Sequence, residues 1–394
     1  MKDTSIVFTG DIGFDKYMDG KWKDESLVDD DCLAFLRSGN HLVINVEGPL
    51  SKQEKIVKEN GVTALTHSMN PEVADFFKKI GADIWNINNN HIMDAGEKGM
   101  RDTLLKAEEN GVRTLGAGMN IEEASKPVVI DECGGIALIG VGYDRACRIA
   151  SEDSPGCLNF SRMDIIKKQI DDAKKKCRWV IVVAHDGEEF TSLPMPYTRE
   201  RYKEYLNYGA DIVVAHHPHV PMNYELFEGQ DNIGGSKAIF YSLGNFIFDT
   251  DYQRAQFNTE YGVILKLKLT NFAFQFEPIG IKIDRDTDRI IKWDIPDVFD
   301  NVPEEEYKKL LPLAARAFIE NTKRQLRYLK PDEYMTADEE KFKANFYEPL
   351  RSGRVPGKLL DMQIVYPLSL EADNGEWKTS SLNKVKEYIL KQIK

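Results

Sequence analysis

The sequence predicts an α/β protein with a helical C-terminal part. Three observations support this fold class. Short Val- and Ile-rich runs recur along the first 300 residues, and many of them end in polar residues. Helical patterns bounded by N-cap residues and terminal glycines separate several of these runs. From residue 303 on, the pattern becomes charged and helical. We therefore assign residues 1–300 to one main domain and residues 301–394 to a helical appendage packed on it.

The first part of the chain alternates strands with helices, which favours parallel pairing through right-handed crossovers. Asn70 and Pro71 are expected to open one helix, and Asp94 is expected to cap the next. Two strands joined at Cys133 are expected to pair. The expected strands are residues 4–9, 41–47, 83–87, 112–115, 127–131 and 135–141, and the expected helices are residues 71–80 and 97–110.

Further along the chain, helices and strands continue to alternate up to residue 215, and after that the expected strands follow one another directly. Ser161 is expected to cap a helix at residues 162–176, which is followed by a strand, a helix and a strand at residues 179–184, 198–208 and 211–215. The later strands have no helices between them and predict a second, mostly antiparallel sheet. These strands are residues 238–242, 262–269, 272–279 and 290–295, and the final expected helices are residues 304–328, 337–347 and 382–393.

Composition limits the class of protein. Apolar residues at 42% and charged residues at 29% are ordinary for a soluble globular protein. The net charge of -12 argues against a nucleic-acid partner or an anionic membrane surface. Five scattered cysteines without a CxxC motif indicate reduced thiols. No apolar run reaches the roughly 18 residues of a membrane span, and no signal peptide is evident, so we expect a cytoplasmic protein.

Three of the seven histidines, His216, His217 and His219, directly follow the expected strand at residues 211–215. In an extended chain, His217 and His219 would face the same side, and His216 would face the other. That spacing suits two ligands of one metal centre, with His216 outside it. A histidine-rich surface loop, or histidines satisfied in the core, would give the same local pattern.

Polar residues at the ends of other expected strands favour the metal interpretation. Strands of one sheet bring their ends together, so residues far apart in sequence can form one cluster. Histidine and carboxylate without thiolate suits Zn, Mn or Fe. The set is too large for one tetrahedral ion, so we expect two divalent metal ions sharing a carboxylate. The candidates are Asp11, Asn45, Glu47, Asn90, His91, His185, His217 and His219.

The order of these motifs resembles the CapA-like capsule-synthesis family, whose members are tied to poly-γ-glutamate synthesis, attachment or hydrolysis. That family looks like a branch of the calcineurin-like metallophosphoesterases. The resemblance therefore implies two packed mixed β-sheets, flanked by helices, around a two-metal site. The motifs are Gly10-Asp11, Asn45-Val-Glu47, Asn89-Asn-His91 with Asp94, His185-x-Gly-Glu188, His216-His-Pro-His-Val220 and Tyr241-Ser-Leu-Gly-Asn-Phe246.

The resemblance also implies a role for each matching residue. Glu47 stands where the bridging carboxylate is expected, and His91, positioned by Asp94, would protonate a leaving group. Glu188 is either a partner that orients His185 or part of a solvated loop. The implied metal ligands are Asp11, Glu47, Asn90, His185, His217 and His219. The residues expected beside them, around the metals or the substrate, are Asn45, Glu188, His216, Ser242 and Asn245.

This chain departs from the related patterns at several positions. Gly13 replaces the histidine that phosphoesterases carry two residues after the first aspartate, and Val46-Glu47 replaces an Asp-Arg pair. These two changes disfavour phosphoester hydrolysis. Within the capsule-synthesis family, Asp186 stands where Trp is usual, and Ala215 stands where Gly is usual.

The leading hypothesis is a metal-dependent hydrolase whose dinuclear site activates water for attack on an amide or ester bond. The resemblance implies γ-linked glutamate as the polymer, so the expected partner is an anionic polymer or a small acidic substrate. One alternative is a non-catalytic scaffold or binding subunit of polymer synthesis, which the departures at Gly13 and Val46-Glu47 favour. Another alternative is a cytoplasmic phosphodiesterase.

Overall fold

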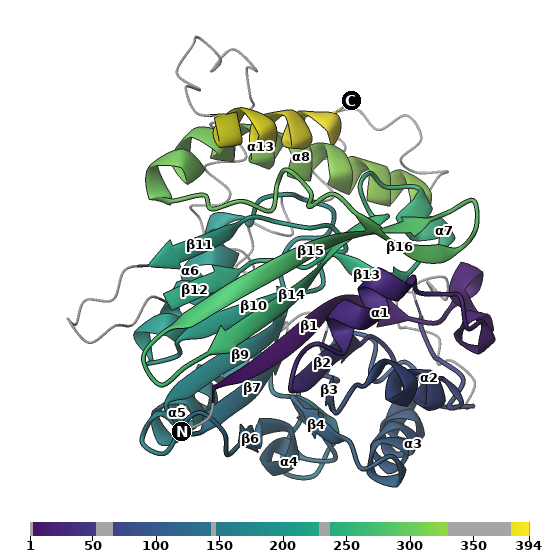
Figure 1. The fold of residues 1–394 in the computed structure, drawn as a ribbon, viewed down its shortest axis with the longest axis vertical. Helices are drawn as coiled ribbons and strands as arrows, with labels where there is room; N and C mark the ends of the chain where they lie inside the picture. The colour runs from purple at the N-terminus through teal and green to yellow at the C-terminus, as the bar shows by residue number, and fades with distance from the viewer. Residues whose placement is uncertain (1–2, 53–65, 143–146, 228–236, 330–379, 394) are drawn as a thin grey trace.

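The computed structural model describes residues 3–52, 66–142, 147–227, 237–329 and 380–393 (Figure 1). Its main body consists of two mixed β-sheets packed face to face, with helices on both outer faces. Ile6 and Phe8 of one sheet meet Ile181 and Val214 of the other in a shared apolar core. The predicted α/β class, with two mixed sheets flanked by helices, is confirmed.

The first sheet has β1 at its centre. Strands β1 to β4 pair in parallel, and β14 pairs antiparallel with β1 on the side opposite β2. The late strands therefore extend this sheet, and the prediction of a separate antiparallel sheet was wrong. The strand order is β16 (Arg289–Trp293), β15 (Phe274–Asp284), β14 (Tyr261–Leu269), β1 (Thr4–Gly13), β2 (His41–Val46), β3 (Ile84–Asn86) and β4 (Arg113–Leu115), with β13 (Asn245–Phe248) paired to the end of β1.

The second sheet holds the middle of the chain. Its four inner strands are parallel, and its two outer strands are antiparallel to their neighbours. β9 and β10 are buried along their whole length, which explains their uninterrupted apolar sequences. The order is β11 (Tyr224–Phe227), β12 (Lys237–Phe240), β10 (Ile212–His216), β9 (Trp179–His185), β7 (Ile136–Gly142) and β6 (Val128–Ile130), while β5 (Ala117–Gly118) and β8 (Gly156–Cys157) form a small separate pair.

Apolar helix faces cover the outer side of each sheet. Phe77 of α2 packs with Trp85 on the first sheet, and Ile166 of α5 packs with Val180 on the second. The helices of the main body are α1 (Asp30–Leu36), α2 (Val73–Ile80), α3 (Gly96–Glu109), α4 (Ile121–Ser125), α5 (Met163–Lys174), α6 (Pro196–Asn207) and α7 (Asp251–Arg254), with short 3-10 turns at Lys16–Met18, Lys21–Lys23 and Phe160–Arg162.

Three helix starts differ from the predictions. Asn70 Oδ1 accepts a hydrogen bond from Glu72 N, so a turn precedes α2 and the helix begins two residues after Pro71. Asn159, rather than Ser161, caps the turn before α5, because its side chain accepts from Ser161 N. Asp94 does not cap α3, because its carboxylate is engaged by a histidine ring and by the backbone N–H of His67.

The C-terminal helices α8 (Glu304–Leu329) and α13 (Ser380–Lys391) pack against each other along one end of the main body (Figure 1). Their apolar side chains share a cluster with Leu193, Met195 and Val298. The helix expected at residues 337–347 lies outside the described residues. Among the helices that the structure describes, none is long and apolar enough to cross a membrane.

A close crossing of backbones places the end of β1. Asp11 N donates to Gly244 O at 2.9 Å. A Cβ at Gly10 would lie 2.1 Å from that same oxygen, so only glycine allows the approach. Gly244 itself has φ +68°, in the left-handed region that glycine adopts without strain. Gly10 and Gly244 thereby fix the position of the Asp11 backbone, from which its carboxylate extends.

Replacing Gly10 with alanine should therefore destabilise the fold by about 1–3 kcal/mol, because the added methyl group forces the two backbones apart. Denaturation in guanidinium chloride would measure the change. Gly111→Asn is the matched control, since Gly111 follows α3 with φ +66° and has open space around it. A Gly10→Ala midpoint equal to that of the wild type would contradict this account.

Candidate metal centre

The candidate metal centre lies where strands of the two sheets end beside each other. The first sheet supplies Asp11 from β1 and Glu47 just after β2. The second sheet supplies His185 at the end of β9 and the two histidines that follow β10. The expectation that the strand ends of a single sheet form the cluster was wrong. Asp11 and Glu47 come from the first sheet, His185, His217 and His219 come from the second, and the site joins them.

Glu47 is the centre of this cluster. Its side chain is fully buried, and its Oε1 lies 3.5 Å from His219 Nε2, 3.8 Å from His185 Nε2 and 4.0 Å from His91 Nε2. Nitrogen and oxygen ligands of one zinc ion, each bonded at about 2.0–2.2 Å, lie roughly 3.3–3.6 Å apart in a tetrahedron. The shorter of these separations is thus close to the spacing of ligands around a common cation.

Three overlapping groups of ligand atoms have all members within 4.8 Å of one another. The first group is Glu47, His185 and His217, the second is Asp11, Glu47 and His219, and the third is Glu189, His217 and His219. Asn90 Oδ1 lies 2.9 Å from His185 Nε2 and so belongs with the first group. The structure therefore brings all six sequence-predicted ligands together, and Glu47 is shared between two groups.

Asparagine side chains fix how the ligands point. His219 Nδ1 lies 2.9 Å from Asn245 Oδ1, whose amide nitrogen donates to Thr259 O, so His219 Nε2 is left facing Glu47. Asn45 Nδ2 donates to Asp11 Oδ1 at 2.8 Å and so orients that carboxylate. Such outer contacts commonly set the tautomer of a ligand imidazole.

The electrostatics of the centre suit a cation. Burial lowers the pKa of His185 and of His217, so both imidazoles are held in the neutral form that binds metals. Burial also acts to lower the pKa of His219, but Glu47 and Asp11 outweigh it and raise that pKa to about 10. Two buried carboxylates thus concentrate negative charge where the ligand atoms converge.

The turn after β10 has an unusual backbone. His217 has φ +98° and His219 has φ +58°, both in a region that non-glycine residues rarely adopt. The two rings reach one centre because this backbone turns, so the expected extended segment was wrong. His216 points elsewhere, with Nε2 2.9 Å from Thr9 O and Nδ1 3.2 Å from Ala184 O, and it ties the two sheets together.

A histidine–aspartate pair borders the cluster. His91 Nδ1 lies 2.6 Å from Asp94 Oδ2, which leaves His91 Nε2 on the side of Glu47. Sequence reasoning missed a second histidine here. The His67 ring stands edge-on to that of His91 with centroids 4.2 Å apart, and His67 N donates to Asp94 Oδ2. His67 belongs to none of the motifs, so nothing in a single sequence pointed to it.

Two of the expected neighbours have other contacts. Glu188 accepts hydrogen bonds from Met195 N and Thr198 Oγ1, so its buried carboxylate holds the start of α6. The two interpretations offered for Glu188, an orienting partner of His185 or a solvated loop, therefore need correction. Ser242 Oγ accepts from Gly244 N and supports the turn before β13.

The structure shows what surrounds Gly13 and Asp186, two positions at which this chain differs from the related motifs. A Cβ at Gly13 would lie 2.4 Å from the Phe248 ring, so Phe248 occupies the space of the absent histidine. Asp186 pairs with Arg201, whose guanidinium lies 3.7 Å from the centre of the Phe160 ring.

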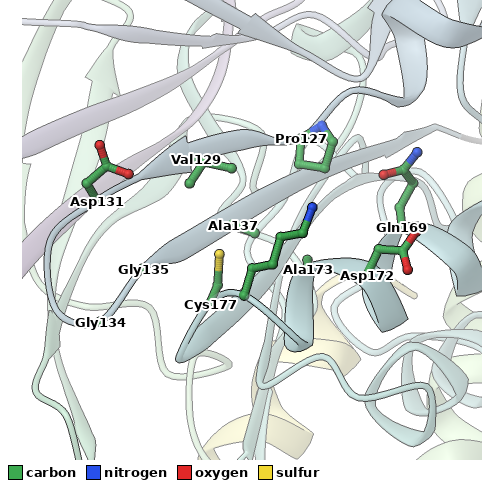
Figure 2. A pocket seen from close by; sticks show the side chains of 11 residues that line it. Pro127, Val129, Asp131, Gly134, Gly135, Ala137, Gln169, Asp172, Ala173 and Cys177 are labelled. Carbon is green, nitrogen blue, oxygen red and sulfur yellow. The ribbon is translucent and has the colours of Figure 1, made fainter.

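An open pocket of about 550 Å³ lies away from the centre, between the hairpin of β6 and β7 and the helix α5. Figure 2 shows its lining, whose titratable side chains are those of Asp131, Asp172, Lys176 and Cys177. None of the six predicted ligands lines this pocket. The candidate site is therefore identified by its cluster of histidines and carboxylates and not by this pocket.

The Asn245→Ala variant should bind Mn²⁺ or Zn²⁺ about 10–100-fold more weakly than the wild type, because His219 loses the acceptor that orients it. Titration calorimetry of the purified chain would measure the affinity. Ser242→Ala is the matched control, since its hydroxyl supports only the neighbouring turn. Equal metal affinity in Asn245→Ala and the wild type would contradict the assignment.

Comparison with known proteins places the chain in a family. The family described as "Bacterial capsule synthesis protein PGA_cap" matches residues 5–250. The "Capsule biosynthesis protein CapA" of Bacillus anthracis is 31% identical over 229 residues, which are 56% of this chain and 54% of that protein. The chain therefore matches about half the length of that relative. The "PGA biosynthesis protein CapA" of Bacillus subtilis is 29% identical over 282 residues, covering 70% of this chain and 71% of that one.

Among solved structures, TT1561 of Thermus thermophilus overlaps with a TM-score of 0.35 and 11% identity, over 67% of this chain and 94% of that one. A likeness at that level carries no weight for fold or function. The family match spans more than half of the chain and includes every sequence-predicted ligand. The protein belongs to the bacterial capsule synthesis family PGA_cap.

Proposed function

We propose that this protein is a metal-dependent hydrolase with a two-ion site that acts on an amide or ester bond of an acidic polymer. The observation that carries the proposal is the placement of Glu47. Its carboxylate is shared by two groups of buried ligands, and His91 faces it from the side. A carboxylate shared by two positions, beside a histidine that could give a proton, suits hydrolysis assisted by two metal ions.

The two positions would share Glu47 and otherwise use different residues. One would be formed by Glu47, Asn90, His185 and His217, and the other by Asp11, Glu47 and His219. Oxygen and nitrogen donors without thiolate suit Mn, Zn or Fe. Two such ions, when bound, would provide a water-derived nucleophile at neutral pH and polarise the carbonyl oxygen of the substrate.

His91 would supply the proton for the leaving group. The Asp94 carboxylate holds Nδ1, so Nε2 faces the cluster and is the atom from which His91 would give its proton. The edge-on ring of His67 limits the movement of His91. Both side chains are buried.

The names of the relatives support a poly-γ-glutamate substrate, since the Bacillus subtilis relative is described as a PGA biosynthesis protein. An acidic chain would also be attracted to a centre that carries two cations. The Phe248 ring in place of the phosphoesterase histidine supports an amide or ester substrate over a phosphodiester.

The enclosure of the centre favours a second candidate, a non-catalytic binding subunit that assists a polymer synthase. Phe190 and Phe248 lie over His219, with ring centroids 5.9 Å and 4.9 Å from its own. Glu47 and His185 have no exposed surface. A centre closed in this way could serve binding and stability without turnover.

The deciding experiment compares cleavage of poly-γ-glutamate by the manganese-loaded wild type and by His91→Ala. The wild type should shorten the polymer and release new amino groups, and the variant should be about 10²–10⁴-fold slower while binding the same metal. His41→Ala is the matched control, because His41 pairs with Asp83 away from the centre.

A wild type that binds metal but cleaves neither the polymer nor simple amides and esters would reject the hydrolase in favour of the binding subunit. Turnover of a generic aryl phosphodiester alone would instead point to a phosphodiesterase. Equal rates for His91→Ala and the wild type would remove His91 from the proton transfer.

A further inference from the structure

The two proposed metal positions are unequal. Among the residues that the structure describes, the first has four candidate ligands, and the second has three, Asp11, Glu47 and His219. Residue 13 is a glycine, and the Phe248 ring fills the space beside it. A further protein ligand would give the second position as many ligands as the first.

We propose that Glu189 is this ligand and that the C-terminal helices α8 and α13 position it. The inference rests on the proposed two-ion centre. A carboxylate oxygen of Glu189 lies within 4.8 Å of a ring nitrogen of His219, which belongs to the second position, and of one of His217, which belongs to the first. Glu189 is half-buried, whereas Asp11 and Glu47 are fully buried, so it approaches the cluster from the more accessible side.

The loop that carries Glu189 is tied to the histidine turn. Phe190 N donates to Pro218 O at 2.8 Å, between the two histidines. The Phe190 ring lies nearly parallel to that of His219, at an angle of 24°. Phe190 also has φ +59°, a strained backbone that these contacts keep in place.

The C-terminal helices hold this loop through side-chain amides. Gln325 of α8 donates to Glu189 Oε2 at 3.3 Å, and Tyr252 Oη donates to the same oxygen at 3.1 Å. Asn321 of α8 and Gln392, just beyond α13, both donate to Phe190 O. Asn321 and Gln392 are almost completely buried. Two helices therefore place buried polar groups on one carbonyl next to Glu189.

These contacts suit a metal ligand. Both donors to Glu189 Oε2, from Gln325 and Tyr252, are neutral groups. Ligand carboxylates are commonly hydrogen-bonded in this way, and the outer partners fix their orientation. The apolar side chains of Leu193 and Met195 anchor the next part of the same segment in the core of α8 and α13. The helices α8 and α13 thus contact the segment that carries Glu189 and connect it to the C-terminal part of the chain.

Metal stoichiometry tests the inference without reference to activity. The apo chain is titrated with Mn²⁺ by calorimetry, and bound metal is counted by elemental analysis. The wild type should bind two ions, and Glu189→Gln should keep one and bind the other about 10-fold or more weakly. Glu188→Gln is the matched control, because the neighbouring carboxylate holds α6 and should leave both ions bound.

A double variant identifies which ion is affected. Asp11→Asn combined with Glu189→Gln should still bind one ion, since both changes act on the same position. Loss of both ions in the double variant would overturn the assignment to the Asp11 position. Gln325→Ala should weaken the same ion, whereas Lys309→Ala, at an exposed site on α8, should not.

The outcomes separate the two proposals. Two ions bound with unchanged affinity in Glu189→Gln would overturn the role of Glu189 and leave the proposed function standing. A wild type that binds no metal, or only one ion, would overturn both. Circular dichroism melting of each apo variant distinguishes a lost ligand from a lost fold, and a Glu189→Asp variant that regains the second ion would support direct ligation.

Discussion

The candidate metal centre is organised around a buried carboxylate between two sheets. Glu47 lies among imidazole nitrogens of His219, His185 and His91, with no exposed surface. Moving a carboxylate out of water costs several kcal/mol unless opposite charge compensates it. Asp11 lies in the same region and adds a second buried charge. The cluster is thus a place where the fold accepts a cost in stability, and a cation would offset that cost.

The pairing of the strands and the packing of the two sheets bring the residues of the centre together. Parallel pairing of β1 with β2 aligns Asp11 with Asn45, and parallel pairing of β9 with β10 aligns His185 with His216. The shared apolar core presses the two sheets together so that their strand ends meet. Left-handed backbone at His217 and His219 then turns both rings into the centre, and His216 ties the turn to both sheets. Strain of this kind persists where the surroundings fix it, and it often marks a functional site.

Sequence alone predicted the α/β class, most strands and the six residues that now lie together. Those signals are local, because short apolar runs with polar ends carry them. The pairing of β14 with β1, the turned backbone at His217 and the placement of His67 are not local. They depend on which sheet edge stays available, and on contacts between segments far apart in the chain. Glu188 and Glu189 show the limit clearly, since adjacent carboxylates face different partners and only the folded loop separates their roles.

The most direct test of the account is anomalous diffraction from crystals soaked in Mn²⁺ and recorded at the manganese edge. The account predicts two peaks that share Glu47, one beside His185 and His217 and the other beside Asp11 and His219. A single peak, or peaks that do not touch Glu47, would contradict the claim that this buried carboxylate bridges two ions.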